Sequence, residues 1–274
     1  MTTANIARTD DGTIQINFSI PKADIDKAEV KALADLAKDI TVAGFRKGKA
    51  PTEKVKERID PGQLLEKTLG QILPDAYTKA ITDNKIRPII YPKFEIIKQG
   101  EVWEVQAQIA ELPQVELPDY KDLIKSALAT LKKDATKQEK EDVVIKTLVL
   151  GIKVNLPKIL IDEEVNARLS ELLARTERLG LKFEQYLASI GKDEKTIRTE
   201  YETQVKNGIS VELILNKIAE VEKTEIDEKD VDAALKTSGV AEAGHEGHDH
   251  LEEQKLMIRS VLKRRAVLNQ LTKA

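Results

Sequence analysis

The segment from Thr13 to Ile20 alternates strictly between apolar and polar residues, and this alternation constrains the fold more than any other feature. The apolar positions are Ile14, Ile16, Phe18 and Ile20. Successive side chains of a strand point to opposite faces of a sheet, so the pattern predicts a strand with one buried face. Two further segments, Phe94 to Lys98 and Trp103 to Ile109, predict a hairpin. The first part of the chain therefore needs a sheet with one covered face.

Apolar residues at helical spacing between these strands predict the layer that covers the sheet. They recur every three or four positions from Ile25 to Ile40 and again from Leu64 to Ala80. A short basic helix is expected from Pro51 to Ile59, because proline favours the first turn of a helix. The extended segment that ends at Pro118 is typical of a linker between domains. Residues 1–118 are therefore predicted to form an α+β domain.

After residue 136 the apolar pattern is helical throughout. One long helix is expected to fill a face with Val165, Leu169, Leu172, Leu173 and Leu179. Asp162 is expected to cap its start and Gly180 to end it. The last helix, after Glu252, is expected to bury Ile258, Val261, Leu262, Leu268 and Leu271. Long helices joined by short loops predict an all-α extended helical domain over residues 119–274, with some apolar surface left exposed.

Composition limits the functions open to the chain. Its 274 residues, 33% of them charged and 41% hydrophobic, suit two soluble domains. No apolar run approaches the roughly 20 residues that cross a bilayer, and the start of the chain lacks a signal peptide's apolar block. We therefore expect a cytoplasmic protein with no membrane partner. The absence of cysteine excludes disulfides and thiolate catalysis, and a net charge of −3 argues against DNA binding through a broad basic face.

A basic loop with one aromatic residue lies between two of the predicted helices. Its sequence is Gly44-Phe45-Arg46-Lys47-Gly48-Lys49-Ala50-Pro51. Two glycines and a proline indicate a tight turn. From Gly44 to Arg58 there are six cations and two acidic residues, a local excess of four positive charges. Because charge runs are usually solvated faces, a turn whose phenylalanine folds back onto its own domain is the simpler alternative.

This loop resembles the ribosome-docking signature Gly-Phe-Arg-x-Gly-x-x-Pro of trigger factor, the bacterial chaperone at the polypeptide exit tunnel, and most of the chain resembles that family. The run from Leu156 to Glu164 resembles, less specifically, the start of the long arm helix in the family's C-terminal domain. The resemblance implies partners at the ribosome near the tunnel exit and among unfolded nascent polypeptides, and no cofactor. It implies docking through Gly44, Phe45, Arg46, Lys47, Gly48, Lys49 and Pro51.

The chain departs from the family pattern after the linker. Trigger factors usually carry there a prolyl-isomerase domain of about a hundred residues, a typical domain size. Here the interval from Asp119 to Lys140 suits a single amphipathic helix and is too short for that fold. Tyr120 is the only aromatic residue between Trp103 and Phe183, so an aromatic-lined proline pocket is not expected either. We therefore expect no enzyme activity and assign no catalytic residue.

Two further sets of residues are candidates for binding. Flexible or aromatic side chains suit promiscuous contact with clients, and those outside the strict helical pattern are Phe183, Tyr186, Tyr201 and Met257. The alternative is that they close the core of the helical bundle. The histidines of the chain fall in one short stretch and could bind a transition metal: His245, His248 and His250. The alternative for that stretch is a flexible loop between helices.

Together these features predict an ATP-independent chaperone, a monomer or weak homodimer, that docks at the exit tunnel and holds nascent chains on exposed apolar helical surface. The alternative is a helical scaffold or assembly factor that uses the basic loop on a ribosomal or RNA partner and holds no clients.

Overall fold

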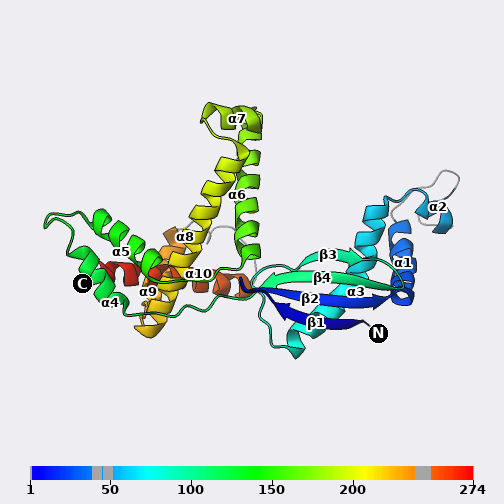
Figure 1. Ribbon diagram of the computed structural model, residues 1–274, viewed down its shortest axis with the longest axis horizontal. Coiled ribbons are helices and arrows are strands. Elements are labelled where there is room, and N and C mark those ends of the chain that lie inside the picture. The colour runs from blue at the N-terminus through cyan, green and yellow to red at the C-terminus, as the bar shows by residue number, and fades with distance from the viewer. Residues whose placement is uncertain (1, 39–44, 46–51, 238–247, 274) are drawn as a thin grey trace. The chain divides into compact units, whose positions relative to one another are not determined.

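The computed structural model describes residues 2–38, 45, 52–237 and 248–273. The chain falls into two compact units, and each has its own hydrophobic core. The first unit comprises Met1–Leu112 with Pro157–Leu160, and the second comprises Pro113–Leu156 with Ile161–Ala274. Figure 1 shows strands and helices in the first unit and helices in the second. The predicted fold class, α+β followed by all-α, is confirmed.

The sheet of the first unit is antiparallel with strand order β1-β2-β4-β3. Its strands are β1 (Thr3–Arg8), β2 (Thr13–Pro21), β3 (Lys93–Lys98) and β4 (Val102–Ala110). The predicted inward set of β2 is confirmed, because Ile14, Ile16, Phe18 and Ile20 are all fully buried. The predicted hairpin is also confirmed as β3 and β4. The sequence did not predict β1, in which Ile6 is the only large apolar side chain.

Three helices belong to the first unit: α1 (Lys22–Ala37), α2 (Thr52–Lys56) and α3 (Pro61–Asp83). In Figure 1, α3 lies along one face of the sheet. Leu73 and Ala80 of α3 and Ile25 of α1 are buried against the inward residues of the strands. Asp60 caps α3, since its Oδ2 accepts a hydrogen bond from the backbone N–H of Gln63 at 3.0 Å. These helices form the covering layer that the sequence predicts.

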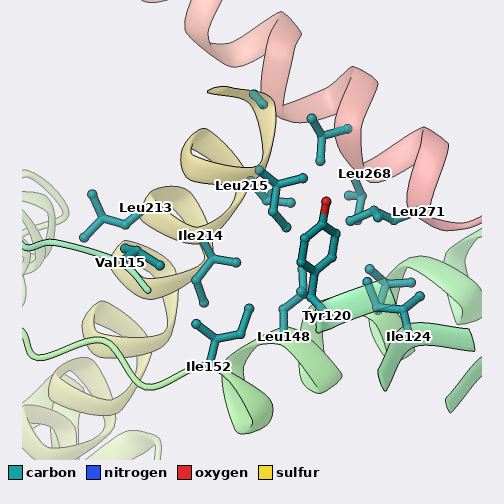
Figure 2. Packing of buried hydrophobic residues seen from close by; sticks show 14 residues of the cluster. Val115, Tyr120, Ile124, Leu148, Ile152, Leu213, Ile214, Leu215, Leu268 and Leu271 are labelled. Carbon is teal, nitrogen blue, oxygen red and sulfur yellow. The ribbon is translucent and has the colours of Figure 1, made fainter. Parts of the chain in front are cut away.

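The second unit is helical. Its helices are α4 (Tyr120–Leu128), α5 (Lys137–Gly151), α6 (Lys158–Arg178), α7 (Phe183–Ser189), α8 (Glu194–Val221), α9 (Glu228–Thr237) and α10 (His248–Leu271). The helix expected in the interval from Asp119 to Lys140 is α4. Figure 2 shows the main core, where the Tyr120 ring lies among Leu148, Leu215 and Leu271 of three other helices. The Tyr120 hydroxyl donates a hydrogen bond to Glu222 Oε1 at 2.6 Å, which ties α4 to the end of α8.

Helices α6, α7 and α8 form what we call the arm. Ile161 and Val165 of α6 pack with Val205 of α8 in a separate small core. Figure 1 shows α6 and α8 side by side, with α7 connecting them at the far end. The expectation that Leu173 and Leu179 fill the buried face of α6 is wrong, because they are 41% and 69% exposed. In the arm core, α8 packs against the first half of α6, and Leu173 and Leu179 lie beyond the residues of that core.

The start of α6 also differs from the expectation. Asp162 lies inside the helix, and the prediction that it is the N-cap is wrong, because α6 begins at Lys158 directly after Pro157. The first backbone N–H of α6 is satisfied by a residue distant in sequence, since Lys158 N–H donates to Asp11 Oδ2 at 2.9 Å. Gly180 ends the arm helix as predicted, with a φ of 72° that favours glycine.

Asp11 lies in the turn between β1 and β2 and accepts several hydrogen bonds there. Its carboxylate accepts from the backbone N–H and hydroxyl of Thr13, from the hydroxyl of Thr9 and from Lys158. Partial burial alone would raise the pKa of Asp11, but these hydrogen bonds outweigh it and lower the pKa from 3.8 to about 2. In its ionised form, the Asp11 carboxylate therefore stabilises both the β1–β2 turn and the start of α6.

Ion pairs fix α10 against its neighbours. Lys255 pairs with Asp232 of α9 at 3.1 Å, and Arg264 pairs with Glu212 of α8 at 2.8 Å. Leu268 and Leu271 are buried as expected. The expectation that Val261 is buried is wrong, because this side chain is 49% exposed. The cations of α10 face the partner helices, so part of the predicted apolar stripe is left in solvent.

Candidate functional site

The predicted docking loop connects α1 and α2, and the structure describes one of its residues. Phe45 is 43% exposed, which is high for a large aromatic side chain. The other predicted docking residues lie outside the described residues: Gly44, Arg46, Lys47, Gly48, Lys49 and Pro51. Docking through this loop therefore stays a prediction.

The helices that flank the loop in sequence share a small hydrophobic cluster. This cluster joins Ala32 and Leu33 of α1, Val55 of α2, and Ile59 and Leu64 beside and within α3. Val55 is fully buried, so its side chain holds the short helix α2 in this cluster. The cluster packs the flanking helices α1 and α2 against the start of α3.

Some of the positive charge beside the loop is already paired within the unit. Lys56 pairs with Glu29 of α1, and Lys54 pairs with Glu57 at 3.1 Å. Arg58 makes no ion pair with the residues that the structure describes. The simple charge count of the sequence therefore overstates the charge that α2 offers to a partner.

The candidate client residues lie in different environments. Phe183 and Tyr186 of α7 are half-buried, and Met257 of α10 is 72% exposed. Tyr201 of α8 packs against the arm core, as the alternative reading of the sequence expects. The set does not form one patch. Its members on α7 lie among exposed leucines that the sequence analysis did not select.

Exposed apolar residues flank α7 on both sides. Leu179 and Leu181 precede it with exposed fractions of 69% and 44%, and Ile190 follows it at 40%. Gly180 and Gly191, with φ of 72° and 67°, make the tight turns at these places. Leu181 follows the turn at Gly180 and lies outside the helical period, and this is the signal that could have found it. We call the segment from Leu179 to Ile190 the arm tip.

The structure describes only part of the predicted metal site. His245 lies outside the described residues, while His248 and His250 begin α10 with side chains that are not described. Among the remaining described residues no group of three or more His, Asp or Glu is placed to hold a metal ion. Within the same described part of the chain, no helix combines the length and apolar character needed to cross a membrane.

Two family models match the chain. The model described as "Bacterial trigger factor protein (TF)" matches residues 2–148, and "Bacterial trigger factor protein (TF) C-terminus" matches residues 116–273. The matches overlap at residues 116–148, which form α4 and most of α5. The two models therefore account for nearly all of the sequence without an additional domain between them.

Curated relatives named trigger factor are similar to parts of the chain. The protein of Lactococcus lactis subsp. cremoris (strain SK11) is 32% identical over 163 residues, which are 59% of this chain and 36% of that protein. The protein of Rhodococcus opacus (strain B4) is 35% identical over 112 residues, or 40% of this chain and 24% of the relative. The chain thus spans about a third or less of the length of these curated relatives.

A solved structure has a similar fold. It is described as "Promiscuous Substrate Recognition in Folding and Assembly Activities of the Trigger Factor Chaperone", and it matches 99% of both chains with a TM-score of 0.60 and 12% identity. At this identity the likeness concerns the fold alone. Each of the two family models covers more than half of the sequence, and the chain therefore belongs to the trigger factor family.

Proposed function

We propose that this chain is an ATP-independent chaperone that docks at the ribosomal exit tunnel through residues 44–51 and holds unfolded nascent chains on the arm tip. Residues 1–118 act as the ribosome-binding domain and residues 119–274 as the chaperone domain. The protein acts in the cytoplasm as a monomer or weak homodimer, without DNA or membrane partners. Membership of the trigger factor family supports this role.

The observation that carries the proposal is the exposed apolar surface of the arm tip. Leu179, Leu181 and Ile190 are each at least 40% exposed, and Phe183 and Tyr186 lie half-buried between them. Exposed apolar patches in a folded protein mark interaction sites. Covering a few hundred Å² of such surface at about 25 cal/mol per Å² gives several kcal/mol before ordering costs. This is enough for reversible holding and too little to trap a client.

The docking half of the proposal rests on Phe45 and on the packed helices that flank the loop. A half-exposed aromatic side chain beside cations suits a small interface, in which aromatic and arginine residues contribute most of the binding energy. The cluster around Val55 packs α1 and α2, the helices on either side of the loop in sequence, against α3. Binding through the loop between them need not unfold the domain.

We also propose that the chain has no peptidyl-prolyl isomerase activity. An isomerase needs an enclosed apolar pocket for the twisted amide, and the interval expected to hold that domain contains α4, a turn and the start of α5. Tyr120, the aromatic residue of this interval, is buried in the main core, and its hydroxyl donates a hydrogen bond to Glu222 Oε1. It is therefore not free to line a substrate pocket.

The second candidate function is a helical scaffold that binds a ribosomal or RNA partner and holds no clients. The packing of Tyr201 into the arm core favours it, because this aromatic residue closes the arm. An aggregation assay distinguishes the two functions: the full chain is mixed with a chemically denatured client in the absence of ATP. A chaperone suppresses aggregation in proportion to its concentration. Ribosome binding without any suppression at excess protein would favour the scaffold.

A further inference from the structure

Strand β3 lies at one edge of the sheet of the first unit, next to β4 (Figure 1). Its residues, Lys93 to Lys98, form no backbone–backbone hydrogen bond to a described residue outside the sheet. The outer N–H and C=O groups of an edge strand can pair with another strand. The docking loop and the arm tip contribute no residue to β3. This edge is therefore a surface that docking and client holding do not use.

The edge carries exposed apolar side chains. Tyr91, just before the strand, is 95% exposed, and Ile97, near its end, is 53% exposed. The ring of Phe94 lies 6.2 Å from that of Tyr77 and 6.5 Å from that of Phe18, measured between centroids. Phe94 thus belongs to the inner face of the sheet, yet it is 38% exposed because the sheet ends beside it. Exposed apolar surface of this kind marks an interaction site.

The charged residues of β3 lie on the outer face of the sheet. Lys93 is opposite Gln108 of β4, and Glu95 is opposite Gln106. They flank Phe94 in sequence, so they point away from the face to which its ring belongs. Both are exposed, and neither makes a hydrogen bond or an ion pair with a residue that the structure describes. The edge therefore offers one positive and one negative charge, two positions apart, to a partner.

We propose that β3 pairs with β3 of a second copy of the chain, in an antiparallel two-fold contact centred on Phe94. This rests on the homodimer in the proposed function and gives it an interface. Residues directly opposite each other in an antiparallel pair lie on the same face and interact. The register centred on Phe94 places Lys93 of each copy opposite Glu95 of the other. Two opposite-charge pairs then form on the outer face, and the two Phe94 side chains meet on the inner face.

The other symmetric registers lack this complementarity. Because opposite residues share a face, a two-fold contact must be centred on a single residue. A contact centred on Lys93 or on Glu95 puts like charges directly opposite each other, which is destabilising. A contact centred on Ile96 runs into the bulge between Ile96 and Lys98 and places neither charge opposite its counterpart. Two-fold pairing uses the β3 edge of both copies, so assembly stops at a dimer, and the small contact makes this dimer weak.

Sedimentation equilibrium of the full chain tests the proposal. The wild-type protein should show a reversible monomer–dimer equilibrium that weakens as the salt concentration rises. Glu95→Lys and Lys93→Glu should each weaken the dimer roughly tenfold or more, because both attractive pairs become repulsive. Glu225→Lys makes the same charge change at an exposed carboxylate of the second unit and should leave the dimer unchanged. All three positions are exposed, so the melting temperatures should stay close to that of the wild-type protein.

Two combinations of these changes should restore pairing. The double variant, Lys93→Glu with Glu95→Lys, exchanges the two charges and should dimerise like the wild-type protein. An equimolar mixture of the two single variants should form a heterodimer, because one chain then offers two positive charges and the other two negative charges. This rescue depends on the register, since a change that merely disturbs the fold would not be repaired by a second one.

A wild-type chain that stays monomeric at high concentration would overturn the proposal. Single variants that dimerise as well as the wild-type protein, or a failure of both combinations to restore pairing, would overturn it as well. Weaker client binding by Glu95→Lys with no change in oligomeric state would also contradict it, because the edge would then pair with an extended client strand. The sedimentation experiment contains neither ribosomes nor clients, so its failure is distinguishable from a failure of docking or of client holding.

Discussion

Replacing Leu179 and Leu181 together by serine should weaken client holding while the protein stays folded. The two side chains are 69% and 44% exposed at the arm tip. Substitutions at exposed positions usually change the free energy of unfolding by no more than about 0.5 kcal/mol. The melting temperature should therefore remain close to that of the wild-type protein.

The expected loss of affinity follows from the apolar area that a client can cover. Full burial of a leucine side chain is worth about 1.5 to 3 kcal/mol, and the exposed fraction sets how much of this remains available. Scaled by these fractions, the pair contributes on the order of 2 kcal/mol, which corresponds to a Kd weakened roughly 30-fold. This is an upper value, because a client covers each side chain only in part.

The assay measures the Kd for an unfolded, fluorescently labelled polypeptide and the suppression of aggregation of a denatured client without ATP. Leu112→Ser is the matched control, because Leu112 is 63% exposed in the first unit and away from the arm tip in sequence. The control should bind like the wild-type protein. Unchanged client binding by the double variant would refute the assignment of the arm tip. A large fall in its melting temperature would show instead that these leucines belong to the core.

The remaining predictions concern stability and catalysis. Asp11→Asn should lower the free energy of unfolding at neutral pH by about 1 kcal/mol, after discounting the pKa shift for the exposure of the carboxylate. The pKa of Asp11 is lower in the folded state, so its stabilisation is present above pH 3.8 and is lost as the pH falls toward 2. Urea unfolding of both proteins between pH 7 and pH 2 checks this, and a difference that persists at the lowest pH would contradict the role of the ionised carboxylate. The chain should not accelerate a proline-limited refolding phase when it is present in catalytic amounts. Acceleration that rises with the concentration of the chain would show that an isomerase site exists, although the interval from Asp119 to Lys140 is too short for the isomerase fold.

The strands and most helices could be predicted from the sequence because their periodicity is local. The alternation around Ile16 and the positive φ of Gly180 both follow from residues within one element or turn. Strand β1 could not be predicted, because Ile6 alone gives no alternating pattern. Its place in the sheet comes from pairing with β2, which is a tertiary effect.

The wrong predictions for Asp162 and Leu179 at the arm also arise from tertiary structure that a local pattern does not contain. Asp162 has the right residue type for a cap, yet the helix begins earlier, directly after Pro157. The carboxylate of Asp11, in the β1–β2 turn, accepts its first N–H. Leu179 fits the helical period, but it lies just after the last residue of α6 and is 69% exposed. A sequence pattern gives the side of a helix that is apolar. It does not give how far along the helix a partner extends.

The candidate sites differ in how far the sequence could identify them. The docking loop was selected from its motif and charge, and the structure describes Phe45 of it. The arm tip combines Phe183 and Tyr186, which the sequence selected, with Leu181, which it did not.

Co-sedimentation with ribosomes that carry a nascent chain tests the central claim most directly. The wild-type protein is compared with the variant in which Phe45, Arg46 and Lys47 are all replaced by alanine. The wild-type protein should pellet with the ribosomes, and more weakly as the salt concentration rises, because the proposed docking pairs cations of the loop with phosphate or acidic protein. The triple variant should remain in the supernatant with an unchanged melting temperature. Equal pelleting of the two proteins would contradict docking through this loop.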